Sequence, residues 1–199
     1  MTGKVIVHIA VEGDLDEWVA RKMIAHIRVE DDLSCRVFGK RGKTYLQERI
    51  HNYNQAAHKN TLWFVLIDLD RNDCAPALRN RWLPQPAATM CFRIAVRSIE
   101  AWLLADRSNI ARFLGVSRDA IPPSPEQLPD PKQTLINLAS RSRKRKIREG
   151  LVPIQGQRIG PAYNSYLLEF VRNSWNIMQA ASNAPSLQRA LDCLQRLLQ

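Results

Sequence analysis

Short apolar runs that alternate with helical patterns constrain the fold of this chain more than any other feature of its sequence. The runs span residues 4–11, 34–38, 62–67 and 90–96, and the helical patterns begin near residues 14, 43 and 99. Strands that alternate with helices favour a parallel sheet covered on both faces. We therefore expect an α/β fold in which a central, mainly parallel sheet of about four strands is flanked by helices.

A proline-rich segment at residues 120–131 interrupts the pattern. It contains Pro122, Pro123, Pro125, Pro129 and Pro131, and regular structure cannot continue through such a run. Amphipathic helical patterns resume at residue 132. We therefore expect an α/β domain at residues 1–119, a linker at 120–131, and an α-helical C-terminal cap at 132–199 that contains a basic loop.

Composition narrows the class of partner. The formal net charge of +10 favours a polyanion such as nucleic acid. The four cysteines form no C-x-x-C pair and have no histidines at ligand spacing, which predicts neither a zinc site nor a disulfide framework. No run of about 18 apolar residues and no secretory leader pattern is present. We expect a soluble, cytoplasmic protein with no membrane partner, and the oligomeric state stays open.

Five acidic residues fall where the predicted strands end. Glu12 ends the first run with Asp16 one helical turn later, Asp68 and Asp70 end the third, and Glu100 follows the fourth. The carboxyl ends of parallel strands open on one edge of a sheet, which is where sites form. Residues i and i+4 share a helix face, and residues i and i+2 share a strand face. The spacing therefore predicts that the five carboxylates converge.

A carboxylate cluster of this kind requires cations. Two negative charges about 4 Å apart repel by roughly 4 kcal/mol at an effective dielectric constant near 20. Oxygen ligands without cysteine or histidine suit a hard ion, Mg²⁺ or Mn²⁺. Two such ions support the in-line displacement at a phosphodiester. The cluster therefore predicts metal-dependent hydrolysis of phosphodiester bonds.

Each acid taken alone also has a structural explanation. Asp14 could cap the helix that follows the first strand, and Asp68 and Asp73 could accept hydrogen bonds from turn amides. The prediction of a metal site therefore rests on the set of acids and not on any one of them.

At these residues the sequence resembles the Toprim superfamily. Glu12-Gly13 matches its Glu-Gly after the first strand, and Asp68-Leu69-Asp70 matches its Asp-x-Asp after a later strand. The similarity is greatest to stand-alone bacterial Toprim-like proteins of unknown function and to the Toprim domain of overcoming-lysogenization-defect nucleases. Those proteins carry Glu-Gly-x-x-Glu and Ser-x-Glu, where this chain has Asp16 in place of the second Glu, and Ser98-Ile99-Glu100. The resemblance extends to Asp106.

The resemblance implies a Toprim-like, Rossmann-related domain and a nuclease that depends on Mg²⁺ or Mn²⁺. Glu12 would act as general acid/base or metal ligand, and a basic residue, Lys132 or Lys43, would stabilise the transition state. The implied metal ligands are Glu12, Asp16, Asp68, Asp70 and Glu100. Topoisomerases and primases need further domains, for which 199 residues leave no room. By analogy alone, the resemblance suggests an effector of bacterial phage defence that works with an ATPase partner.

Two basic segments are candidates for contact with nucleic acid. The first contains Lys40, Arg41 and Lys43, and the second, within residues 141–148, contains Arg143, Lys144, Arg145 and Lys146. The second is either a solvated loop or a contact. The first also suggests a phosphate-binding loop, but G-x-x-x-x-G-K-[ST] requires a glycine where Val37 stands. An NTP-binding phosphotransferase is therefore the lesser alternative.

A third reading is a non-catalytic module that binds nucleic acid or a protein partner and has kept the fold. The aspartate at position 16, where the related nucleases have glutamate, favours it. Neither a base-reading motif nor an aromatic RNA-binding signature is present, so DNA and RNA, including tRNA, stay open as substrates.

Overall fold

The structure is a computed structural model that describes residues 5–28, 33–72 and 74–199. It divides into two compact units, which are described separately. Unit 1 comprises residues 1–96 and 188–199, and unit 2 comprises residues 97–187. The predicted boundary segment at 120–131 falls inside unit 2. Lys4, the predicted start of the first strand, lies outside the described residues.

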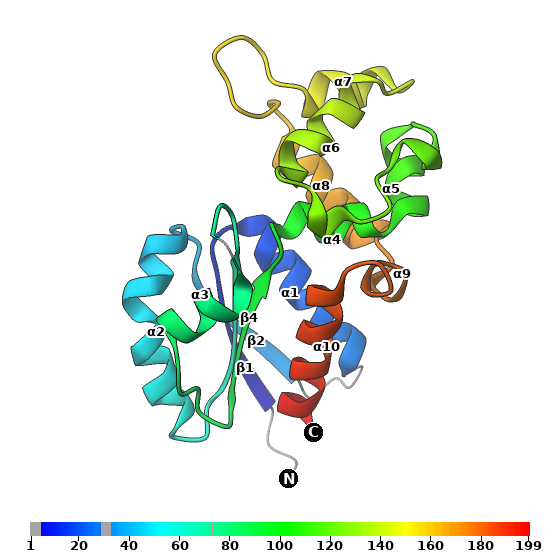
Figure 1. The fold of residues 1–199 in the computed structure, drawn as a ribbon. Helices are drawn as coiled ribbons and strands as arrows, with labels where there is room; N and C mark the ends of the chain where they lie inside the picture. The colour runs from blue at the N-terminus through cyan, green and yellow to red at the C-terminus, as the bar shows by residue number, and fades with distance from the viewer. Residues whose placement is uncertain (1–4, 29–32, 73) are drawn as a thin grey trace. The chain divides into compact units, whose positions relative to one another are not determined.

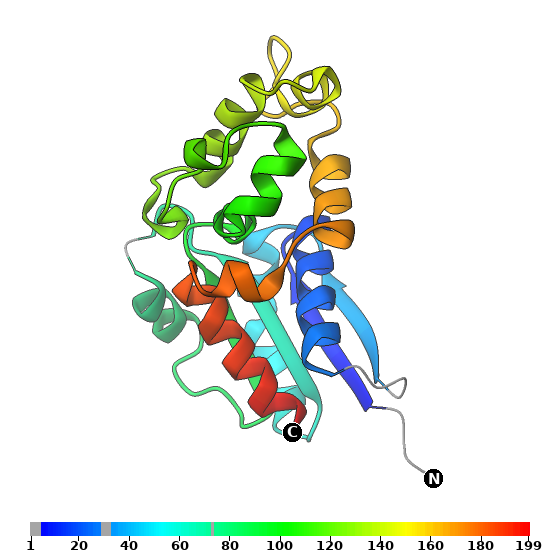
Figure 2. The same cartoon turned by 90° about the vertical axis from the view of Figure 1, so that its right-hand side faces the viewer.

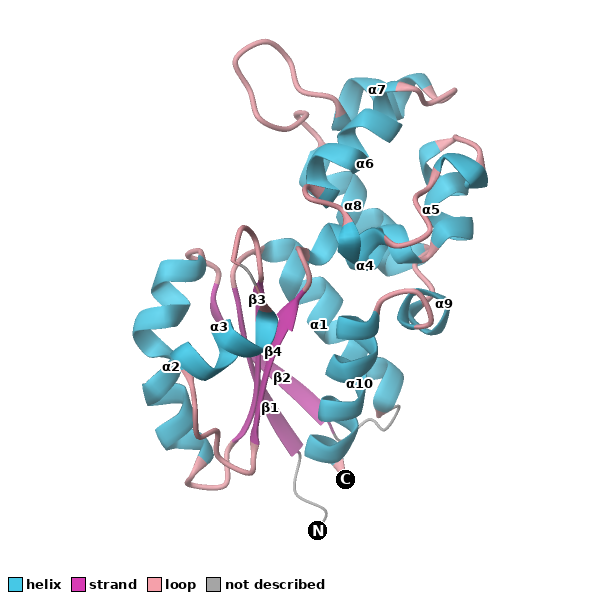
Figure 3. Cartoon of the chain, viewed as in Figure 1, coloured by secondary structure: helices cyan, strands magenta, loops and turns pink. Residues whose placement is uncertain are grey.

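Unit 1 is built on a sheet of four parallel strands in the order β2-β1-β3-β4 (Figure 3). The predicted α/β fold with a parallel sheet is confirmed. The strands follow the apolar runs because a strand covered on both faces needs mostly apolar side chains, and this is clearest in β3, whose positions 63–67 are all buried. Their bounds are β1 (Val5–Val11), β2 (Leu33–Gly39), β3 (Leu62–Asp68) and β4 (Met90–Ala95).

Helices cover both faces of the sheet. In Figures 1 and 2, α1 (Asp14–Ile27) and α10 (Pro185–Leu198) lie on one face, and α2 (Lys43–Ala57) and α3 (Ala75–Trp82) lie on the other. The core under α2 and α3 contains Trp63, Trp82 and Phe92. Helix α3 was not predicted, because eight residues with few apolar positions give no clear periodicity.

A disulfide joins Cys91 on β4 to Cys193 on α10, across 102 residues of sequence. The expectation that the cysteines form no disulfide is wrong for this pair, because the fold brings together two residues that no short spacing connects. Cys35 and Cys74 are free thiols. The disulfide fixes the C-terminal helix to the last strand of the sheet.

Unit 2 is helical. Helix α4 is buried along its whole length. The proline-rich segment lies between a 3-10 turn that ends at Ala120 and a helix that begins at Pro131, and it contains one further 3-10 turn, as expected where amide donors are missing. The elements are α4 (Ile99–Ala105), α5 (Arg107–Leu114), η1 (Arg118–Ala120), η2 (Pro125–Gln127), α6 (Pro131–Ser140), α7 (Arg145–Leu151), α8 (Tyr163–Asn173) and α9 (Ile177–Ala181).

The predicted basic loop is partly wrong, because its second half is the first turn of α7. The hydroxyl of Ser142 accepts a hydrogen bond from the amide of Lys144 at 2.9 Å, just before the helix begins. Among the described residues, no helix is both long and apolar enough to cross a bilayer.

Candidate functional site

Two predicted carboxylate residues meet at the carboxyl edge of the sheet in unit 1. Glu12 follows β1, and Asp68 ends the neighbouring strand β3. The amide N–H of Asp68 donates to Oε1 of Glu12 at 2.8 Å. This hydrogen bond ties the Glu12 carboxylate to the end of the adjacent strand, and it depends on the parallel register of β1 and β3.

A turn directly after β3 presents Asp70. The amide of Leu69 donates to the carbonyl oxygen of Ala95 at 2.8 Å, which fixes the turn against β4. Asp70 has φ 55°, in the left-handed region that aspartate tolerates better than most residues. The side chain of Asp70 is about half exposed, whereas Leu69 is buried. The Asp-x-Asp motif thus places its second carboxylate at the surface of the edge.

Lys43, the first residue of α2, lies among these groups. Its Nζ donates to Oδ2 of Asp70 at 2.7 Å and to the carbonyl oxygen of Leu69 at 3.4 Å. It also donates to the carbonyl oxygen of Asp68. The structure therefore brings Glu12, Asp68, Asp70 and Lys43 together, and it places a positive charge at the carboxylate edge.

The loop between β2 and α2 explains why Lys43 reaches this place. The amide of Lys40 donates to the carbonyl oxygen of Val11 at 2.8 Å, and the amide of Gly42 donates to that of Glu12 at 3.1 Å. Gly39 has φ +89°, and a Cβ there would collide with the carbonyl oxygen of Val11. Since the Gly42 amide already bonds to Glu12, it is not presented to a phosphate as a phosphate-binding loop requires.

Lys40 faces acidic residues of α1. Its Nζ lies 2.5 Å from Oδ1 of Asp14 and 3.0 Å from Oε2 of Glu17, whose Oε1 accepts from Nε of Arg21 at 2.8 Å. The hydrogen bonds to Asp14 and Glu17 raise the pKa of Lys40. Burial alone would raise the pKa of Glu17, but the hydrogen bonds from Arg21 and Lys40 outweigh it and the pKa is lowered. The lysine predicted to contact phosphates is thus paired within the protein.

The remaining predicted residues of unit 1 differ in exposure. Asp16 is buried on the first turn of α1, and its Oδ2 lies 3.3 Å from the place that a Cβ on Gly13 would occupy. Gly13, and not Asp14, is the N-cap of α1. Arg41 is exposed, with its guanidinium 5.3 Å from the centre of the Tyr45 ring. Asp73 lies outside the described residues.

The donor chemistry of the edge suits a hard cation. Glu12, Asp16, Asp68 and Asp70 offer only oxygen, which Mg²⁺ and Mn²⁺ prefer. Across residues 5–28, 33–72 and 74–199, no three His, Cys, Asp or Glu side chains are gathered as a set that could hold a metal ion. The cation that the structure does place beside these oxygens is the Lys43 ammonium group.

Glu100 belongs to a separate cluster inside unit 2. It lies on the first turn of α4, is 3% exposed, and accepts from Ser98 Oγ at 2.7 Å through Oε2. Its Oε1 accepts from the hydroxyl of Tyr163 at 3.1 Å and lies 3.4 Å from Nζ of Lys132. The Lys132 ammonium also lies 5.9 Å from the centre of the Tyr163 ring. The two residues predicted on separate grounds, Glu100 and Lys132, form an ion pair.

Sequence reasoning did not find Tyr163. It lies 63 residues after Glu100 and on the apolar stripe of α8, so its local pattern indicates only a core residue. A tyrosine on such a stripe must satisfy its hydroxyl when buried, and this is the one available signal that it has a polar partner.

The second basic segment divides into residues with and without partners. Nζ of Lys144 donates to the carbonyl oxygens of Arg112 at 2.7 Å and Phe113 at 3.0 Å, at the end of α5. Arg145 pairs with Glu149 at 2.6 Å. Within the described chain, the side chains of Arg143 and Lys146 make neither a hydrogen bond nor an ion pair, and both are exposed. Lys144 is thus a structural residue of unit 2.

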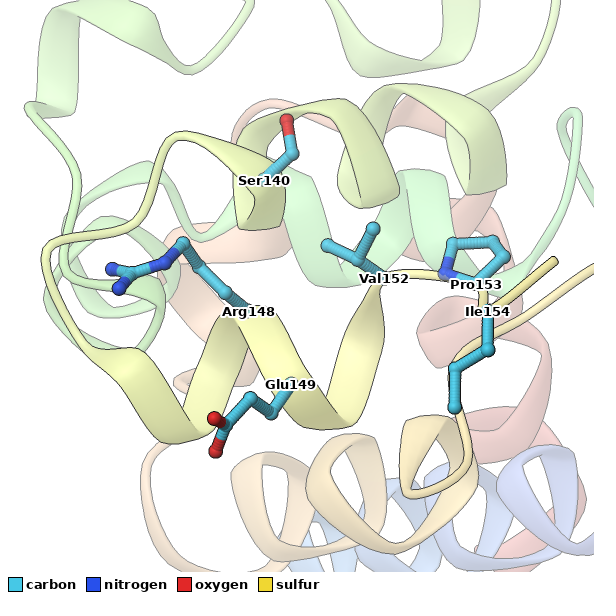
Figure 4. A pocket seen from close by; sticks show the side chains of 6 residues that line it. All are labelled: Ser140, Arg148, Glu149, Val152, Pro153 and Ile154. Atoms are coloured by element: carbon cyan, nitrogen blue, oxygen red, sulfur yellow. The ribbon is translucent and has the colours of Figure 1, made fainter.

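A hollow of about 450 Å³ lies beside α7 in unit 2. Figure 4 shows Val152, Pro153 and Ile154 at one side of it and Arg148 at the other. Arg148 Nη1 donates to the carbonyl oxygen of Ser142 at 2.5 Å, and Glu149 pairs with Arg145. Both charged groups at the hollow are thus bonded to their own helix or to the turn before it, and neither is directed at a ligand.

The chain matches no family model, and no curated protein or solved structure is significantly similar to it. Its class is therefore defined by fold and geometry alone. It is an α/β protein whose parallel sheet carries carboxylates and a lysine at its carboxyl edge.

Proposed function

We propose that this protein is a Toprim-like nuclease that hydrolyses phosphodiester bonds of DNA or RNA with Mg²⁺ or Mn²⁺. The observation that carries the proposal is the meeting of Glu12, Asp68, Asp70 and Lys43 at the carboxyl edge of a parallel sheet. Carboxylates alone at that edge would be explained by turn capping. A lysine held among them adds the positive charge that a phosphodiester requires.

Each group has a distinct role in the proposed reaction. Asp68 and Asp70 would hold the metal with Glu12, while Lys43 would stabilise negative charge on the phosphate oxygens. When bound, Mg²⁺ or Mn²⁺ supplies Lewis-acid activation and lowers the pKa of its water. The amide of Asp68 holds the Glu12 carboxylate in place, so that carboxylate is oriented before substrate binds. The roles of Glu100 as metal ligand and of Lys132 as basic residue stay predictions, since the two residues lie in unit 2 and pair with each other there.

The experiment is cleavage of labelled plasmid, single-stranded DNA and total tRNA in Mg²⁺ or Mn²⁺. The test variant is Asp68→Asn/Asp70→Asn, which removes two charges with little change in volume. The matched control is Glu48→Gln/Glu169→Gln, which removes the same charge from exposed positions of α2 and α8. Cleavage by the wild type and the control, but not by the test variant, is the expected result. Equal cleavage by all three would contradict the proposal.

A second candidate function is a non-catalytic nucleic-acid-binding module, which the pairing of Lys43 with Asp70 favours. An ammonium group that neutralises the carboxylates permanently would leave no place for a metal. Binding of the same substrates without cleavage in any metal would support this second function. In either case the substrate class is nucleic acid, and we propose that the protein works where that substrate is found, in the cytoplasm.

A further inference from the structure

Four arginines gather at the free edge of the sheet in unit 1. Strand β4 is last in the order β2-β1-β3-β4, so no strand pairs with its outer edge in the described part of the chain. Arg93 lies on β4, Arg79 on α3, and Arg189 and Arg196 lie on α10. The pKa of Arg93 is lowered by burial and by the charges of Arg79, Arg189 and Arg196, while Asp192 acts in the opposite direction. One carboxylate thus stands among four guanidinium groups.

None of these guanidinium groups has a partner among the described residues. No hydrogen bond or ion pair joins any of the four to another described residue, and Nε of both Arg79 and Arg93 is buried without a partner. Buried donors are almost always paired, because an unpaired one loses its water without replacement. An anion at this edge would accept hydrogen bonds from the terminal nitrogens of the guanidinium groups and would relieve the repulsion among the four charges.

The Cys91–Cys193 disulfide holds these residues in register. Cys91 and Arg93 are two residues apart on β4 and therefore point to the same face of the sheet. Cys193 lies between Arg189 and Arg196, which are about two helical turns apart on α10. The covalent link therefore keeps the arginines of α10 close to Arg93 before any ligand binds, which lowers the entropic cost of binding.

The simplest alternative is that the arginines only prevent the edge strand β4 from pairing with another sheet. Charged side chains on an edge strand prevent pairing with another sheet. Prevention of pairing, however, needs only charge on β4 itself, whereas the charges of Arg79, Arg189 and Arg196 on two helices also act on Arg93. Prevention of strand pairing therefore does not explain why Arg79, Arg189 and Arg196 lie near β4 as well.

We propose that Arg79, Arg93, Arg189 and Arg196 form a binding site for the phosphate backbone of a nucleic-acid strand, distinct from the carboxylate edge. Guanidinium groups bind phosphate oxygens through paired, charge-assisted hydrogen bonds. A row of phosphates matches several cations spread over a strand and two helices better than a single small anion does. The net charge of +10 for the chain agrees with a polyanionic occupant. Binding at this site does not depend on cleavage, so it can be tested separately from the proposed nuclease activity.

The test measures binding without catalysis. Anisotropy of fluorescein-labelled single-stranded and duplex oligonucleotides is recorded in EDTA over a range of salt concentrations, in the full-length protein. The test variant is Arg189→Gln/Arg196→Gln, because both residues are exposed. The control is Arg49→Gln/Lys59→Gln, which removes the same charge from exposed positions on and after α2. Arg93→Lys, which keeps the charge but loses the paired donors, is the second variant.

We expect the test variant to bind about tenfold more weakly and to reduce the slope of log K against log salt by about 2. The control should change affinity less than about twofold. Equal losses in test and control would show that only net charge matters, and unchanged binding in the test variant would show that the edge makes no contact. Polyglutamate is the competing probe. If the test variant loses capture of polyglutamate but not of nucleic acid, the occupant is an acidic protein and the proposal is overturned.

Discussion

The two clusters that contain the predicted site residues are built in opposite ways. In unit 1, main-chain groups do most of the positioning: the Asp68 amide holds Glu12, and the carbonyl oxygens of Asp68 and Leu69 accept from Lys43 together with the Asp70 carboxylate. In unit 2, side chains position Glu100, which is buried under Ser98 and Tyr163. An edge set by main-chain groups tolerates changes of side chain, while a buried acid depends on each of its donors.

Substitution of Lys43 and of Lys132 should have the largest effects and should distinguish the roles of the two clusters. Lys43→Ala removes the positive charge from the carboxylate edge, and we expect cleavage to fall roughly a hundredfold because transition-state charge is left unbalanced. Lys132→Ala leaves the buried Glu100 carboxylate without its ion-pair partner, so we expect lower stability as well as lower activity. Single-turnover cleavage and urea titration measure the two effects. A Lys43→Ala variant that cleaves like the wild type would remove Lys43 from the proposed mechanism.

Gly39→Ala tests the main-chain construction of unit 1. The new Cβ would collide with the carbonyl oxygen of Val11 at a positive φ, so we expect a loss of about 3 kcal/mol in the free energy of unfolding. Gly156→Ala is the control, since Gly156 also has a positive φ but nothing within 4 Å. We expect the free energy of unfolding of that control variant to fall by about 1 kcal/mol. Equal losses in urea titration would mean that the close approach to β1 is unimportant.

Tyr163→Phe tests the side-chain construction of unit 2. It removes one donor to the buried Glu100 carboxylate and leaves the ring in place, so we expect a loss of about 1–3 kcal/mol in the free energy of unfolding. Tyr45→Phe, at a partly exposed position of α2, is the matched control and should change stability by less than about 0.5 kcal/mol. No difference between the two variants would show that Glu100 does not need the hydroxyl of Tyr163.

His8 should give the smallest effect. Burial, and then the charge of Arg36, lower its pKa in the folded protein, and its ring stacks on Trp63 at 4.9 Å. The neutral form is thus favoured by folding, so its contribution is complete above the unfolded pKa near 6.5 and is lost as pH falls from that value through the lower pKa of the folded protein. His8→Phe keeps the stack and removes the titration. Thermal unfolding at two pH values should show less acid destabilisation in His8→Phe, by under about 1 kcal/mol, than in a His51→Gln control.

The sequence allowed the sheet and its edge to be predicted because the strands are mostly apolar, and β3 in particular is apolar from residue 62 to 67 and ends at Asp68. Contacts between distant residues left no such signal. Nothing local marks Tyr163 as the partner of Glu100, Cys193 as the partner of Cys91, or α1 acids as partners of Lys40. Helix α7 was missed for a different reason, since a run of cations reads as a solvated loop until Ser142 and the end of α5 are seen to fix its start.

The measurement that tests the central claim most directly is calorimetric titration of Mn²⁺ into the wild-type protein and into Asp68→Asn/Asp70→Asn, with Glu48→Gln/Glu169→Gln as control. Because it follows metal binding and not cleavage, it does not require the substrate to be known. The account predicts saturable Mn²⁺ binding by the wild type and the control, and binding weakened at least about tenfold in the test variant. Equal Mn²⁺ binding by all three proteins, or none by the wild type, would contradict a metal site at the carboxyl edge of the sheet.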